Sequence, residues 1–389
     1  SAMPADRRDA RKAEALSAAQ GFLAATPRDS TSQAAALGLS SWVQYLARLS
    51  EPWNRWGDVQ SHIGLVHHVT AATLVSEGQD PGTHFEDAEA AYDRAILLDP
   101  GSESPYRYWR GGARLVHARH KVQTGDDPRA QYRGAIEDFT YVLDAHPGVV
   151  EVLRQRVEAS IDLSNLAGLS SEETLRISEL AISDLSEISK SDPKDLQALV
   201  DRADCRYRVS TLDGVASETA LDRARRAIED LDRVLKAAPG NSQVVARRGR
   251  TLHQFARILH EMRLPAGEAF ETAIADLDSV IADSPESDEL WEVRGQARMY
   301  LGREQQRSRR DPSSTWKAAL ADFGEAIRLE PARWKAHRDR GRVFEWMGKY
   351  EESVLEFEAA VRLAPENEWN RDALARSRAK AGASWAADL

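Results

Sequence analysis

The chain of 389 residues lacks the features of a disulfide-rich, membrane-spanning or nucleic-acid-binding protein. Its single cysteine, Cys205, excludes a disulfide within the chain, and we expect this residue to be a small buried side chain. No run of about 18 apolar residues occurs, so no membrane span is expected. The formal net charge is −10, whereas general nucleic-acid binding needs a basic surface. We therefore expect a cytoplasmic protein without nucleic-acid or membrane partners.

Motifs for nucleotide binding and catalysis are also missing. The sequence has no G-x-x-x-x-G-K-[ST], G-x-G-x-x-G or G-x-S-x-G run. His67 and His68 are adjacent and point in different directions on a helix, and His117 and His120 are three apart without a nearby acidic ligand. We expect these to be solvent-exposed helix histidines, with no metal and no cofactor. The protein is predicted not to be an enzyme.

What the chain does have is a regular spacing of proline. Five successive intervals are 46 or 47 residues long and the last is 34. The prolines that mark these intervals are Pro100, Pro147, Pro193, Pro239, Pro285, Pro331 and Pro365. An internal period of this length predicts an array of stacked units in place of one globular core.

The same kinds of side chain recur around each proline. A small residue precedes it by twelve positions, a large apolar residue by eight and an aliphatic residue by five, which places all three on one helix face. Proline then ends that helix. Ten residues after the proline stand Gly249, Gly295 and Gly341, with Gly111 near the equivalent position, so we predict close contact between helices there. Each period reads as helix, turn, helix, proline.

These columns resemble the tetratricopeptide repeat over roughly residues 57–367. The last unit matches the family's spacing of about 34 residues. It carries Gly341, Phe344, Ser353, Phe357, Ala360 and Pro365. The length of the other units alone would favour HEAT repeats, which run about 40–47 residues, but the residue columns favour the tetratricopeptide repeat. The resemblance implies an all-α, right-handed α-solenoid of stacked antiparallel helix pairs.

The additional residues of the longer units are predicted to lie around the turn between the two helices. The glycine and the small residue are 24 positions apart in two of the long units and 12 apart in the last unit. Ser171 and Ser217 have the sequence context of helix N-caps. We expect both helices of each long unit to be lengthened by a turn or two.

Four parts follow from this pattern. Residues 1–3 are expected to be a tag remnant, and residues 4–52 an N-terminal helical cap or a degenerate repeat. Residues 53–367 form the predicted array of seven helix pairs, six enlarged and the last of 34 residues. Residues 368–389 form a C-terminal capping helix and tail. Trp369 and Trp385 are candidate contacts between copies of the chain, although packing against the final unit is favoured for Trp369. We expect a monomer by default.

Two columns of opposite charge follow the same period. The arginines nine residues after a proline are Arg156, Arg202, Arg248, Arg294 and Arg340, with Arg110 as the equivalent in the first unit. The acidic residues nine before a proline are Asp138, Asp184, Asp230, Asp276, Asp322 and Glu356. Because arginine can bond a carboxylate through two donors, we predict a ladder of salt bridges that fixes helix register. The alternative is that the arginines line a groove and bind acidic ligands.

By resemblance to the family, the first helices line a concave face at positions 4, 7, 11 and 14 after each proline. Tyr207, Gln296 and Met299 fall on these positions. The candidate partner-binding residues there are Arg250, His253, Lys335, Arg338 and Arg342. We predict a scaffold that binds a protein or an acidic peptide in this groove.

Other readings of the groove remain. Chaperone-binding members of the family hold a C-terminal carboxylate with asparagines as well as basic residues, and this chain lacks those asparagines, so chaperone binding is not expected. One alternative function is a regulatory or sensor region of a larger multidomain protein. An enzyme within the solenoid is the less favoured alternative.

Overall fold

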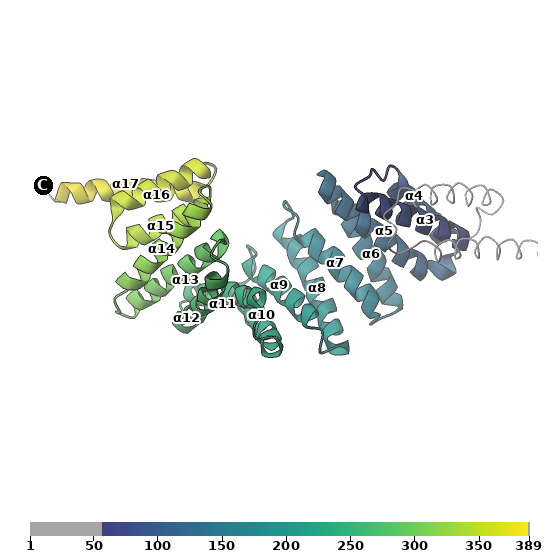
Figure 1. Ribbon diagram of the computed structural model, residues 1–389, viewed down its shortest axis with the longest axis horizontal. Helices are drawn as coiled ribbons and strands as arrows, with labels where there is room; N and C mark the ends of the chain where they lie inside the picture. The colour runs from purple at the N-terminus through teal and green to yellow at the C-terminus, as the bar shows by residue number, and fades with distance from the viewer. Residues whose placement is uncertain (1–56, 388–389) are drawn as a thin grey trace, which may run out of the picture. The chain divides into compact units, whose positions relative to one another are not determined.

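The computed structural model describes residues 57–387, and the side chains of residues 57–382. This part of the chain consists of helices and turns, without a β-strand (Figure 1). The predicted all-α fold is therefore confirmed. The expected tag remnant, the expected cap at residues 4–52 and the side chain of Trp385 lie outside the described residues.

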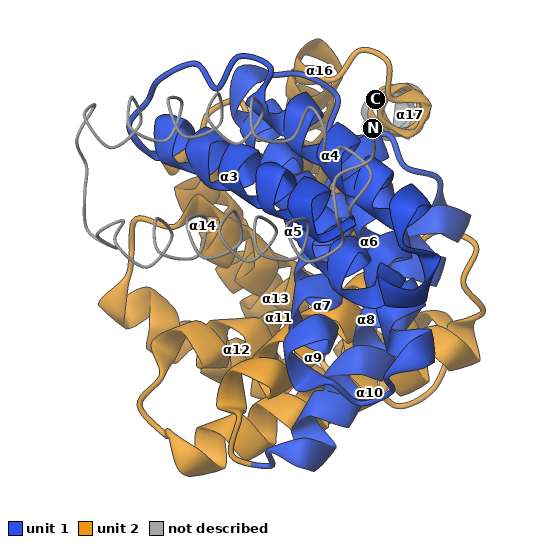
Figure 2. Ribbon diagram, turned by 90° about the vertical axis from the view of Figure 1, so that its right-hand side faces the viewer, with its two compact units in different colours: residues 1–193 blue, residues 194–389 orange. Residues whose placement is uncertain are grey.

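The chain divides into two compact units, residues 1–193 and residues 194–389, which Figure 2 colours separately. The described helices of the first unit form three consecutive pairs. These are α3 (Gly57–Ser76) with α4 (His84–Leu98), α5 (Glu103–Thr124) with α6 (Arg129–Ala145), and α7 (Val150–Ser164) with α8 (Ser171–Ser191). A 3-10 turn, η1 (Pro100–Ser102), joins the first two pairs.

The second unit forms four pairs and a final single helix. Its helices are α9 (Leu196–Thr211) with α10 (Ser217–Ala237), α11 (Ser242–Glu261) with α12 (Gly267–Asp283), α13 (Asp288–Arg307) with α14 (Ser313–Leu329), α15 (Trp334–Trp346) with α16 (Tyr350–Leu363), and α17 (Glu368–Ala387). Within each unit every helix packs on the next one along the chain. The predicted stacking of consecutive helix pairs is thus confirmed.

Each second helix of a pair ends two residues before one of the seven prolines. Helix α4 ends at Leu98, before Pro100, and α16 ends at Leu363, before Pro365. The intervening residue leaves the helical conformation, as Asp99 does with φ −139° and ψ 76°. The proline ring disfavours a helical backbone in the residue before it, which explains this common end point.

In five of the helix pairs a large side chain of the second helix packs on a glycine of the first. Phe323 of α14 is fully buried, and a Cβ atom added at Gly295 of α13 would lie 2.8 Å from its Cε1 atom. Phe139 faces Gly111 at the same distance. The predicted contact at these glycines is therefore present, and it brings the two helix backbones close together.

The first described pair makes the same contact, although the sequence pattern did not identify it. A Cβ atom at Gly64 would lie 3.0 Å from the ring of Tyr92, which is fully buried.

The lengthening of the helices is unequal, which corrects the expectation for the long units. In the pairs α7/α8 and α9/α10 the second helix has 21 residues and the first has 15 or 16. In α11/α12 and α13/α14 the first helix has 20 residues and the second has 17. The final pair has 13 and 14. The N-cap of α8 is Ser170, whose side chain accepts a hydrogen bond from the Glu173 backbone, so the predicted cap at Ser171 was one residue late.

The glycine contact yields a first prediction. Gly295→Ala should lower the free energy of unfolding by about 1–3 kcal/mol, because the added methyl group overlaps Phe323 and forces the two helices apart. Gly324→Ala is the matched control within α14, since the nearest atom to its added Cβ is 3.9 Å away. The control should be neutral or stabilising by up to about 1 kcal/mol. Thermal unfolding of both variants checks this, and equal destabilisation would contradict it.

Candidate functional site

The arginine column faces the aspartate column across five of the helix pairs. Between α7 and α8, Arg156 Nε and Nη2 donate to the two carboxylate oxygens of Asp184 at 2.8 and 2.6 Å. The same two-donor arrangement joins Arg110 to Asp138, Arg202 to Asp230, Arg248 to Asp276 and Arg294 to Asp322. All five aspartates are buried. These contacts constitute a ladder of ion pairs within the pairs of helices.

The last ion pair of the ladder joins residues that are closer in sequence, and three of the other pairs include a second arginine. In the final pair, Arg340 Nη2 donates to Glu356 Oε1 at 2.5 Å, across only 16 residues of sequence. In three pairs a second arginine, one helical turn further on, bonds the same aspartate. These second arginines are Arg114 on Asp138, Arg206 on Asp230 and Arg298 on Asp322. They were not predicted from the sequence, although each stands four residues after an arginine of the column.

Burial opposes the ionised form of one aspartate in this ladder. It raises the pKa of the Asp184 carboxyl, even though Arg156 donates two hydrogen bonds to it. The cost of removing the carboxylate from water therefore outweighs the attraction to arginine, as is common for buried salt bridges. We infer that the ladder contributes chiefly to helix register, because the two-donor contact between arginine and aspartate can form at only one position of the second helix.

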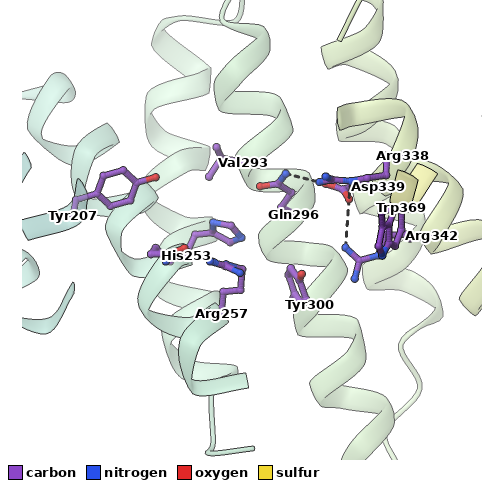
Figure 3. Close-up of a pocket in the computed structure, with 11 residues that line it drawn as sticks. Tyr207, His253, Arg257, Val293, Gln296, Tyr300, Arg338, Asp339, Arg342 and Trp369 are labelled. Atoms are coloured by element: carbon purple, nitrogen blue, oxygen red, sulfur yellow. Dashed lines mark hydrogen bonds and ion pairs between the residues drawn. The ribbon is translucent and has the colours of Figure 1, made fainter. Parts of the chain in front are cut away.

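A pocket of about 440 Å³ lies in the second unit, on the face formed by the first helices of its pairs (Figure 3). Helices α9, α11, α13 and α15 all contribute side chains, and α17 adds one more. The lining residues are Tyr207, His253, Gln254, Arg257, Val293, Gln296, Tyr300, Arg338, Asp339, Arg342 and Trp369. This is the candidate binding site.

One buried carboxylate organises the basic side of the pocket. Asp339 is 1% exposed and accepts two hydrogen bonds from Arg338, at 2.9 and 3.0 Å. Gln296 donates to it at 2.9 Å, and Arg342 lies at 3.5 Å (Figure 3). Burial alone would raise the pKa of Asp339, but Arg338 and Arg342 outweigh it and hold the pKa below its usual value. The carboxylate stays ionised and fixes both guanidinium groups in place.

Aromatic rings flank these arginines. Trp369 of α17 is 42% exposed, and the guanidinium carbons of Arg342 and Arg338 lie 5.6 and 5.9 Å from its ring centre. Tyr300 lies 5.6 Å from Arg342 on the other side. These distances fall in the range of cation–π attraction. Trp369 also packs edge-on against Phe357, with ring centres 6.1 Å apart, so it contacts the final pair as expected.

His253 carries a polar atom that no protein group satisfies. Its side chain is nine-tenths buried in the pocket wall, and its Nε2 atom has no hydrogen-bond partner among the residues that the structure describes. Burial, reinforced by Arg257 and opposed by Asp339, lowers the pKa of His253 to about 4. The ring is therefore neutral near pH 7 and offers one donor and one acceptor. A ligand in the pocket can bond the Nε2 atom.

The structure brings together some of the predicted binding residues and leaves others apart. His253, Arg338 and Arg342 line the pocket, but Arg250 and Lys335 do not. Arg250 pairs with Glu289 at 3.2 Å, and Lys335 is exposed beside the ring of Trp334.

Three further residues bear on the predicted groove. Tyr207 and Gln296 line the pocket as predicted. Met299 does not: it is fully buried and packs with Trp316 in the core. In this unit position 15 after the proline, Tyr300, faces the pocket in place of position 14, Met299.

Several lining residues were not predicted from the sequence. Arg257 follows His253 by four residues, and Tyr300 follows Gln296 by four, so both continue the predicted faces one turn further along the helix. The signal was present, but it required knowing that α11 and α13 are long. Asp339 and Trp369 had no such signal, because they reach the pocket through tertiary packing.

The expectation of solvent-exposed histidines was wrong for all four, since His67 and His117 are buried and His68 and His120 are half-buried. His67 is 9% exposed and His117 is 5% exposed. His117 stacks on Phe85, with ring centres 4.7 Å apart, because it lies on the face of α5 that packs against α4. Cys205 is buried as expected, and burial raises the pKa of its thiol to about 12. Among the described helices none is both long and apolar enough to cross a membrane.

Comparison with protein families supports the resemblance drawn from the residue columns. Residues 314–368 match the family model of the tetratricopeptide repeat. This segment holds nearly all of α14, with α15, α16 and the first residue of α17. The resemblance to this family is therefore confirmed. A search of curated proteins finds no match.

Several solved structures are similar to this chain. A tetratricopeptide repeat protein from Parabacteroides merdae aligns with a TM-score of 0.46 and 14% identity, covering 81% of this chain and 98% of its own. MamA from Desulfovibrio magneticus aligns with a TM-score of 0.38 and 17% identity, covering 55% and 97%. A thermophilic tetratricopeptide repeat protein from Thermus thermophilus gives 0.40 and 17%, covering 57% and 98%.

The ladder yields a second prediction. Arg156→Ala should destabilise the protein by about 3–5 kcal/mol, because it leaves Asp184 buried without its partner. Arg119→Ala is the control, since Arg119 is 44% exposed in its pairs with Glu158 and Asp162 and should cost less than about 1 kcal/mol. The double variant Arg156→Met/Asp184→Leu should recover most of the loss. Thermal unfolding measures all three, and a neutral Arg156→Ala would refute a structural role.

The buried histidines yield a third prediction. The pKa values of His67, His68 and His253 are about 4 in the folded protein, whereas the ordinary value for histidine is 6.5. Between pH 4 and pH 6.5 the unfolded chain therefore binds more protons than the folded protein. Stability should therefore fall as pH falls from 6.5 towards 4. His253 alone accounts for a loss of unfolding free energy on the order of 3 kcal/mol at most over this range.

Melting temperatures measured across this pH range test the prediction. His253→Gln should reduce the dependence on pH relative to the unsubstituted protein, since glutamine does not titrate. An unsubstituted protein whose melting temperature stays constant over the range would contradict the prediction.

Proposed function

We propose that this array of tetratricopeptide-like helix pairs is a non-catalytic scaffold, and that the pocket of its second unit binds an acidic segment of a protein partner. The observation that carries the proposal is the convergence of arginines and an unsatisfied histidine in one pocket. Arg257, Arg338 and Arg342 meet there with the Nε2 atom of His253. All four residues come from first helices of the pairs.

The charge of the pocket favours an anionic ligand. Three arginines line it, whereas Asp339 is its only lining carboxylate. Arg257 also bonds Glu261 at 2.6 Å, but Glu261 is 55% exposed, and an exposed pair of this kind is easily exchanged. An excess of positive charge is therefore left in the pocket, although the whole chain carries −10. Guanidinium groups bond carboxylates through two parallel donors, which suits aspartate and glutamate side chains.

The shape and the rings of the pocket favour a peptide. Its wall crosses successive helices from Tyr207 on α9 to Trp369 on α17, so an extended chain can contact several of them in turn. Tyr207, Tyr300 and Trp369 offer apolar surface with a polar edge, as is common at protein interfaces. An acidic segment with apolar or aromatic flanking residues matches both properties.

The fourth prediction tests this site. Arg342→Gln and Arg257→Gln should each weaken binding of a fluorescein-labelled peptide of alternating glutamate and tyrosine about tenfold, because each removes a charge-assisted hydrogen bond. Both substitutions leave Asp339 paired with Arg338 and Gln296. Fluorescence anisotropy of the labelled peptide gives the affinity.

A second basic pocket of the same unit provides the matched control. It is lined by Arg202, Arg206, Asp222, Arg225, Arg226, Glu229, Asp230 and Arg233. Arg233→Gln removes one exposed charge there and should leave the affinity unchanged. An equal loss in Arg233→Gln and Arg342→Gln would mean that the peptide follows overall charge, and the assignment would fail. A peptide with lysine in place of glutamate should not bind.

A further inference from the structure

Two histidines and an aspartate meet where the first described helix pair turns. His67 lies on α3, and His84 is the first residue of α4. Their Nδ1 atoms are 2.9 Å apart, and the ring centres are 5.1 Å apart. Asp87 lies one turn after His84, with its Oδ2 atom 3.9 Å from His67 Nδ1. The three potential ligand atoms all lie within 4.8 Å of one another.

The donor set is typical of a transition-metal site. Two imidazole nitrogens and a carboxylate oxygen are ligands for Zn²⁺ and neighbouring divalent ions. With metal–nitrogen distances of about 2.0–2.1 Å and a tetrahedral angle, the two nitrogens would stand roughly 3.3 Å apart. The two rings need to separate by less than about half an ångström to reach this spacing, and the ion then lies off their common line, on the side of Asp87.

The surroundings hold the ligands in place and leave one side open. Thr83 Oγ1 donates to Asp87 Oδ2 at 2.8 Å, which orients the carboxylate. Such second contacts are usual around metal ligands. His67 is nine-tenths buried, whereas the side chain of Asp87 is 49% exposed. An ion can therefore enter from the Asp87 side, and water can complete its coordination.

We propose that His67, His84 and Asp87 bind a divalent transition-metal ion of the zinc class, which links α3 to α4 at the first described turn. The sequence alone did not predict this site, because His67 and His84 are 17 residues apart and meet only once the helices pair. A bound ion stabilises the folded pair by mass action. The site belongs to the first unit and is independent of the peptide pocket.

The fifth prediction concerns this site. The full chain, freed of tags and metal by a chelator, should bind one equivalent of Zn²⁺ in isothermal titration calorimetry. His84→Gln and Asp87→Asn should each weaken binding at least about tenfold. Zn²⁺ should raise the melting temperature of the unsubstituted protein and not that of His84→Gln. Bound Co²⁺ should give a visible absorption band that His84→Gln lacks.

Matched controls separate this site from incidental binding. His146→Gln changes an exposed histidine at the end of α6, and His120→Gln changes one in the pair spaced by three residues; both should bind as the unsubstituted protein does. Circular dichroism of metal-free His84→Gln checks that it folds. Unchanged Zn²⁺ binding in a folded His84→Gln, or none in the unsubstituted protein, would overturn the proposal and leave a hydrogen bond between two histidines.

Discussion

The packing of a large side chain onto a glycine is the contact on which the rest of the structure depends in five of the helix pairs. Phe323 lies so close to Gly295 that no Cβ atom fits between them. The residues one position earlier, Arg294 and Asp322, are brought together by the same approach. The apolar contact and the ion pair therefore both depend on the same separation of the two helices. Altering the separation of the helices at the glycine also displaces the ladder.

The ladder joins helices through charged groups whose burial opposes ionisation of Asp184 and Asp322. Burial raises the pKa of Asp184 despite its fork with Arg156, so the pair is not favoured by electrostatics alone. An apolar pair could fill the same space. The two-donor contact forms at one register of the two helices and leaves a buried charge unpaired at any other register. Apolar side chains impose no such penalty. In an array whose units share the same columns, this penalty discriminates between correct and shifted pairing of helices.

Periodicity predicted the fold because each unit repeats the same local chemistry. The prolines indicated where second helices end, and the small and large columns indicated their buried faces. The pocket was only half predictable: His253, Arg338 and Arg342 lie on predicted groove positions, whereas Trp369 comes from the single helix after the array. The meeting of His67 with His84 depends on how the helices pair across a turn, which the sequence spacing does not reveal.

The unequal lengths of the helices connect the repeat to the pocket. Helix α15 has 13 residues and ends 15 positions after its proline. Arg257 stands 18 positions after Pro239, so a first helix of that short length could not present it. The longer α11 carries the groove face one turn further, which adds an arginine beyond His253. Added residues at the turn thus do more than separate two helices, because they extend the binding face along the helix axis while the packing contacts near the prolines stay unchanged.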